Sequence, residues 1–158
     1  MDIRVEVIHR DGWDVMVYHG PINEESEVYL ADIADKVGKK CVVNFRNVNF
    51  INSCGVRGWI NFMRVLEKDD REIVFEECPS HVVMQINMIP SFKGGAQIRS
   101  VFGSYVCENC DKTVDHLFDE NNFPQDLDQS IDPITCAICE EEMEMDELEE
   151  EFFAFLAS

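Results

Sequence analysis

Two closely spaced pairs of cysteines in the last third of the chain have residue types and spacing that suit a metal site. Two residues separate Cys107 from Cys110 and Cys136 from Cys139, and residues 111–135 lie between the pairs. Two such pairs supply four thiolates to one tetrahedral ion, as in a zinc ribbon or knuckle. The spacing therefore predicts a zinc site, and iron stays open as the metal because it also accepts four thiolates.

Two other interpretations compete for the same four cysteines. The first residues, MDIRVEVIHR, lack the apolar core of a signal peptide, and disulfides are rare in the cytoplasm. A redox dithiol would need only one pair. A four-thiolate ion has no open coordination position, so we expect a structural metal that folds a small acidic module. The gap between the pairs is slightly long for this pattern, and we expect "DENNFPQDLDQSIDP", residues 119–133, to form a polar loop.

The other cysteines and the nearby histidine are expected to play no part in this site. Cys41, Cys54 and Cys78 lie in or beside predicted strands, and we expect them in the core because small buried cysteines are common. Cys54 also stands next to a predicted helix start, where a lowered pKa would make its thiol reactive. His116 follows the first cysteine pair, and we expect a surface residue rather than a further ligand.

The stretch "NFINSCGVRGW", residues 49–59, is the second place where residue types suggest chemistry. Asn52, Ser53, Cys54 and Gly55 join a predicted buried strand to a predicted helix. A serine at this place can cap the helix by binding its first amides. It can also accept a phosphate, because a helix N-terminus has unpaired N–H groups and the positive end of the dipole. The residues alone leave both roles open for Ser53.

The elements that position these residues alternate between strands and helices. "IRVEVIHR" and "WDVMVYHG" flank Asp11 and Gly12, a strong turn pair, and predict a hairpin. Asn23 is expected to cap a helix that stops at Gly38. Further strands are expected at "CVVNF", "REIVFEEC" and "GGAQIRSVFGSYV", with helices after the junction and after Pro79. This order predicts an α/β fold, in which a mixed sheet has helices mainly on one side.

The order of elements and several motifs resemble a STAS domain, the small α/β fold of bacterial anti-sigma-factor antagonists. The family signature is Asp-Ser-Ser-Gly and an apolar residue at a helix start, and the matching residues are Asn52, Ser53, Cys54, Gly55 and Val56. The later stretch "IVFEECPSHVVMQINMIPSF" is similar to the corresponding region of the family. The resemblance covers residues 1–105, and Asn52 and Cys54 depart from the signature.

The resemblance implies a regulatory switch at the junction. In the antagonists a partner kinase phosphorylates the first serine of the signature, here Ser53, and the phosphate blocks binding of that partner. The implied partner is an anti-sigma factor or a serine kinase. The candidate partner-binding residues are Asn52, Ser53, Cys54, Gly55 and Arg57. A phosphate would add about −1.5 to −2 charges to the surface that a partner covers.

The charge of the chain changes sharply along its length. The net charge is −19, and residues 106–158 contain 17 acidic residues against Lys112 alone. This shift divides the chain into a STAS-like domain, residues 1–105, and an acidic zinc-ribbon module, residues 106–158. Such a field repels phosphate backbones and anionic lipids, so we expect neither nucleic acid nor membrane as a partner. The sequence has no run of about 18 uncharged apolar residues and no signal-peptide core, so we place the protein in the cytoplasm. At the C-terminus, Leu148, Phe152 and Phe155 would share a helix face that packs back on the protein or docks a partner.

The sequence does not indicate an enzyme. We find no GxxxxGK[ST], HExxH or GxSxG motif. The sequence and the resemblance together predict a bacterial signalling protein that acts by binding proteins, with transcription regulation as the implied process. The main alternative is an adaptor or homo-oligomerising scaffold that is not phosphorylated. A third class, a small-molecule sensor, stays open because some STAS domains bind ligands.

Overall fold

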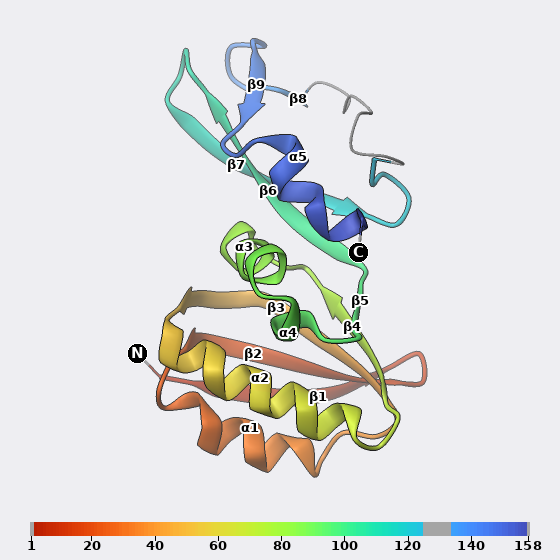
Figure 1. Ribbon diagram of the computed structural model, residues 1–158. Helices are drawn as coiled ribbons and strands as arrows, with labels where there is room; N and C mark the ends of the chain where they lie inside the picture. Colours follow the sequence, from red (N-terminus) through yellow and green to blue (C-terminus); the bar gives the residue numbers. More distant parts are fainter. Residues whose placement is uncertain (1, 125–133, 158) are drawn as a thin grey trace.

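The computed structural model describes residues 2–124 and 134–157, and its first sheet has five strands in the order β1-β2-β3-β4-β5 (Figure 1). The strands are β1 (Arg4–Arg10), β2 (Trp13–Ile22), β3 (Lys40–Ile51), β4 (Glu72–Glu76) and β5 (Gln97–Ile98). β1 and β2 are antiparallel, and the other neighbours are parallel. Asp11 and Gly12 make the predicted hairpin turn with φ of 53° and 84°, as a type I′ turn requires.

Helices α1 (Ser26–Ala34) and α2 (Ser53–Glu67) lie side by side on one face of this sheet (Figure 1). The shorter helices α3 (Ser80–Met88) and α4 (Pro90–Lys93) follow β4. Trp59 of α2 is fully buried, stacks on Phe92 of α4 with ring centroids 5.6 Å apart, and donates its indole N–H to the Phe92 carbonyl at 3.0 Å. The predicted α/β class, with a mixed sheet and helices mainly on one side, is confirmed.

The opposite face of the first sheet has a small apolar cluster of its own, made of Val15, Val42 and Val74. Long side chains from the strands and their ends lie across it. Arg10 reaches from β1 to Glu76 of β4, with the guanidinium 2.6 Å from the carboxylate. The charged groups of Lys40 and Arg99 lie 5.5 and 5.6 Å from the centre of the Trp13 ring. The aliphatic parts of these long side chains thus shield the valines from water, while their charged groups remain hydrated or paired.

The second sheet is antiparallel, with the strand order β7-β6-β9-β8. Its strands are β6 (Ser100–Cys107), β7 (Lys112–Asp119), β8 (Ile134–Thr135) and β9 (Glu142–Met145). The prediction of one last strand over "GGAQIRSVFGSYV" was wrong, because this stretch is divided between the two sheets. Only β5 pairs with β4, whereas β6 takes its partners from the long hairpin with β7. The proposed division at residue 105 stays a prediction, and β6 runs through it.

The C-terminal segment, α5 (Glu149–Phe152) and the 3₁₀ helix η1 (Phe153–Ala157), packs back on the protein. Phe152, Phe153 and Phe155 are buried, and the Asn87 side chain of α3 donates to the carbonyls of Glu151 and Phe152 at 3.0 and 2.9 Å. The prediction for Leu148 was wrong, since its side chain is 68% exposed. Leu148 precedes a helix of a single turn, so it does not continue the apolar face.

The helix after the first hairpin begins later than predicted. Asn23 does not cap it, because the Asn23 side chain accepts the backbone N–H of Glu25 at 2.9 Å and closes a turn ahead of the helix. Ser26 starts α1, and its buried hydroxyl binds the Tyr18 hydroxyl at 2.7 Å. Within the residues that the structure describes, none of the helices has the length and apolar character needed to cross a membrane.

Candidate functional site

The junction between β3 and α2 is capped by Asn52. Asn52 has extended backbone angles, and its side-chain oxygen accepts the backbone N–H of Gly55 at 2.8 Å. This is the geometry of a helix N-cap, in which the side chain satisfies one of the first amides. The interpretation of Ser53 as the cap was therefore wrong, because Ser53 is already the first residue of the helix.

The amide of Asn52 also binds an acidic neighbour. Its Nδ2 donates to the Glu24 carboxylate at 3.0 Å, and this hydrogen bond is the main cause that lowers the pKa of Glu24. An aspartate cannot donate this bond and would bring a second carboxylate close to Glu24. The departure from the family signature at this position thus matches a local contact, because an amide serves both the helix and Glu24.

Ser53 and Cys54 are exposed at the start of α2. In the part of the chain that the structure describes, the Ser53 hydroxyl makes no hydrogen bond. The prediction that Cys54 lies in the core was wrong, whereas Cys41 and Cys78 are buried as predicted. Cys54 belongs to the first turn, on the side of α2 that faces solvent. The Ser53 side chain is therefore accessible without unfolding of the helix.

Gly55 is buried against the end of β2. A Cβ atom on Gly55 would overlap the backbone carbonyl group of Ile22. The same carbonyl accepts the backbone N–H of Asn52 at 3.1 Å. Arg57, one turn after Ser53 on α2, is exposed. The start of the helix is thus fixed to the sheet through its backbone, while the side chains of Ser53, Cys54 and Arg57 remain on the surface.

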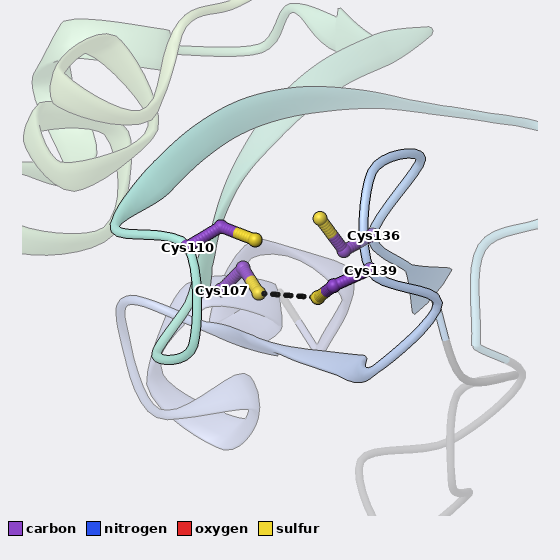
Figure 2. Close-up of side chains that lie close together, drawn as sticks. All are labelled: Cys107, Cys110, Cys136 and Cys139. Carbon is purple, nitrogen blue, oxygen red and sulfur yellow. Dashed lines mark hydrogen bonds between the residues drawn. The ribbon is translucent and has the colours of Figure 1, made fainter.

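The four predicted metal ligands lie together (Figure 2). The sulfur atoms of Cys107, Cys110, Cys136 and Cys139 all lie within 4.8 Å of one another. The sulfur atoms of Cys107 and Cys139 are 3.5 Å apart. Sulfurs at 2.3 Å from a tetrahedral zinc ion are about 3.8 Å apart. The cluster therefore has the donor type and the spacing that a four-thiolate metal site requires.

The two cysteine pairs come from two similar turns that face each other. The backbone N–H of Asp111 donates to the Cys107 carbonyl at 2.8 Å, and that of Glu140 donates to the Cys136 carbonyl at 3.0 Å. Asp111 and Glu140 have φ of 55° and 64°, the left-handed region. The first turn joins β6 to β7, and the second joins β8 to β9. Each turn curls its two cysteines toward the same point (Figure 2).

Hydrogen bonds at the sulfur atoms separate the cysteines by their pKa. The Asn109 side chain and the backbone N–H of Glu141 lower the pKa of Cys139 to about 6. The backbone N–H groups of Cys139 and Ile138 lower that of Cys136. A hydrogen bond with the Cys139 sulfur raises the pKa of Cys110 to about 12, and burial raises that of Cys107. Donors aimed at sulfur stabilise the thiolate, which is the form that binds a metal.

His116 is half-buried and packs edge-on between aromatic rings, with ring centroids 6.1 Å from Tyr105 and 4.7 Å from Phe118. It is no member of the cysteine cluster. The polar loop predicted for residues 119–133 lies partly outside the described residues. In its described part, Asn122 and Phe123 donate their backbone N–H groups to the Asp119 carbonyl at 3.1 and 2.9 Å, which closes a turn after β7.

Sequence analysis missed two residues that support these sites, Glu24 and Asn109. Glu24 is remote from Asn52 in sequence, so its contact depends on the pairing of β2 with β3. Asn109 lies between Cys107 and Cys110. Its place inside this turn could have indicated that its side chain hydrogen-bonds a cysteine sulfur. Both residues act through polar side chains that no spacing rule singles out.

No family model matches the chain. No curated protein matches it either. Among solved structures, the chain is similar to that of the anti-sigma factor antagonist SpoIIAA in its unphosphorylated form, with 17% sequence identity and a TM-score of 0.42. The similar region covers 61% of this chain and 86% of that one.

The contact between Gly55 and Ile22 can be tested by substitution. Gly55→Ala should lower the free energy of unfolding by about 1–3 kcal/mol, because the new methyl group meets rigid backbone rather than a flexible side chain. Gly95→Ala is the matched control, since its Cβ would lie 3.9 Å from the nearest atom, a Glu67 carboxylate oxygen. Urea denaturation measures both. Equal stability of the two variants would show that α2 does not depend on this close approach.

Proposed function

We propose that this protein is a bacterial signalling protein that binds a protein partner through the surface around the start of α2, and that phosphorylation of Ser53 controls the binding. The role matches that of an anti-sigma-factor antagonist, with an anti-sigma factor or a serine kinase as the partner. The protein acts as a regulator and not as an enzyme. The proposal places it in the cytoplasm, where four thiols stay reduced.

One observation carries this proposal: the helix is capped by Asn52, so the structure gives Ser53 no capping role. An exposed serine at the first position of a long helix combines an accessible hydroxyl with a favourable site for a phosphate. The backbone beneath it is held by Asn52 and Gly55. A phosphate would therefore change the charge of the surface without refolding it.

We also propose that Cys107, Cys110, Cys136 and Cys139 hold one structural zinc ion. Four thiolates fill the coordination sphere, so the ion would link the β6–β7 turn to the β8–β9 turn and leave no position for a substrate. Iron fits the same donors, and the chemistry of thiolates favours zinc in a site without a redox role. Metal binding would add folding energy to the acidic module by this link.

A second function is favoured by the contacts of Asn52. Both ends of its amide are hydrogen-bonded, the oxygen to Gly55 and the nitrogen to Glu24, so the residue at the family's aspartate position has a structural task here. A protein that lacks this carboxylate fits an adaptor or homo-oligomerising scaffold, which binds the same partner whatever the state of Ser53. In that case the junction and the metal module serve as constant binding surfaces.

The metal proposal predicts a specific loss of zinc. Cys139→Ser should remove one equivalent of zinc per chain and lower the melting temperature, because the two turns are no longer linked. Cys54→Ser is the matched control, since Cys54 is exposed and lies outside the cluster. Elemental analysis of the purified proteins measures the metal. A full zinc equivalent in Cys139→Ser, or no transition metal in the unmodified protein, would contradict the proposal.

The switch proposal predicts a charge effect on partner binding. Ser53→Asp should weaken the affinity for the protein partner about fivefold or more, because the aspartate adds a negative charge to the contact surface. Ser53→Asn is the control, because asparagine has nearly the size of aspartate and no charge. This variant and Ser53→Ala should both bind like the unmodified protein. Affinities are measured with the isolated partner. Equal affinity for Ser53→Asp and Ser53→Asn would reject the switch and favour the scaffold.

A further inference from the structure

A shallow apolar groove runs between α1 and α2, on the part of the molecule that faces away from the second sheet (Figure 1). It has a volume of about 300 Å³, and its apolar lining includes Leu30, Ala31, Phe62 and Val65. Leu30 and Phe62 are buried, whereas Ala31 and Val65 (46% exposed) lie at its rim. A volume of this size lies at the lower end of the range for ligand pockets and also accommodates a few apolar side chains.

Acidic residues line this groove, and a basic row runs beside it. Arg57, Asn61, Arg64 and the C-cap Lys68 follow each other at helical spacing on α2 and form one exposed row, of which Asn61 lines the groove. Among the described residues, the three cations of this row have no ion-pair partner. Glu27 of α1 and the C-cap Asp35 line the groove and are likewise outside the ion pairs. The carboxylates thus lie in the lining of the groove, and the cations lie beside it in the row that passes through Asn61.

We infer that this groove binds an amphipathic helix of the protein partner, whose apolar stripe is flanked by acidic residues on one side and basic residues on the other. The inference rests on the proposed function and names the chemistry of the partner. The apolar stripe enters the groove, its carboxylates face the row on α2, and its cations face Glu27 and Asp35. A helix lying along two helices buries such a stripe in the manner of other helix-in-groove complexes.

This groove also gives Ser53 a way to act on the partner. Ser53 and Arg57 are four residues apart on α2, so they are neighbours on the helix surface. A phosphate on Ser53 attracts the Arg57 guanidinium and cancels part of the positive charge that holds the carboxylates of the partner. In this way a charge at the start of α2 would change binding along the length of the helix.

The test uses three synthetic peptides of about 18 residues, five helical turns, with the full-length zinc-loaded protein. One peptide has a leucine stripe flanked by glutamates on one side and lysines on the other. The other two carry only glutamates or only lysines beside the same stripe. Fluorescence anisotropy measures affinity, and NMR chemical shifts locate the peptide. We expect the peptide of both signs to bind best, with shifts confined to α1 and α2 and affinity that falls with salt.

Paired variants decide whether the groove itself is the site. Ala31→Trp fills it from its exposed rim and should weaken binding about tenfold or more, whereas Val28→Trp, on a side chain that is 76% exposed and outside the groove, should not. Arg64→Gln should weaken binding about threefold, and Arg4→Gln, which removes the same charge from β1, should not. Circular dichroism checks that each variant folds.

The inference is overturned if none of the peptides shows saturable binding or if all three bind equally. It is also overturned if the chemical shifts change outside α1 and α2, or if the Ala31→Trp variant binds the peptide with the same affinity as the Val28→Trp variant. These experiments leave Ser53 unmodified. If the peptide experiments fail but Ser53→Asp still weakens binding of the protein partner, the groove is rejected and the proposed function is kept. Success here with no effect of Ser53→Asp would keep the groove and reject the switch.

Discussion

The close approach of Gly55 to the Ile22 carbonyl fixes where α2 begins, and the rest of the candidate switch depends on it. That carbonyl also accepts the backbone N–H of Asn52, so the last residue before the helix is tied to the end of β2. Asn52 in turn caps the helix and binds Glu24. Because backbone and cap hold the helix in place, Ser53 has no structural duty and its hydroxyl faces solvent.

The second sheet shares the apolar core of the protein and adds two cysteine turns to it. The two cysteine turns face each other at one end of the β6–β7 hairpin, and the buried phenylalanines of the C-terminal segment pack near its other side, with Phe153 edge-on to Phe118 at 5.1 Å. The many carboxylates of residues 106–158 repel each other. A metal link between the turns would oppose this repulsion through its binding energy, although four thiolates and one Zn²⁺ add a net charge of −2.

Sequence analysis predicted the features that depend on local pattern. The Asp11 and Gly12 turn, the alternation of strands and helices, and the gathering of four cysteines followed from residue types and spacing. The predictions from sequence failed where contacts between residues far apart in the chain determine the structure. Ser26 starts α1 because Tyr18 binds its hydroxyl, β6 leaves the first sheet because β7 pairs with it, and Cys54 is exposed because of the side of α2 on which it lies. The α1–α2 groove was invisible for the same reason, since it needs both helices in place.

The measurement that tests the central claim most directly is peptide-resolved mass spectrometry of the protein isolated from its own cells under several growth conditions. The account predicts a phosphoryl group on Ser53 in the peptide that spans the start of α2, with an occupancy that changes between conditions. A peptide that stays unmodified at Ser53 under every condition would contradict the account and leave the constant scaffold as the function of this surface.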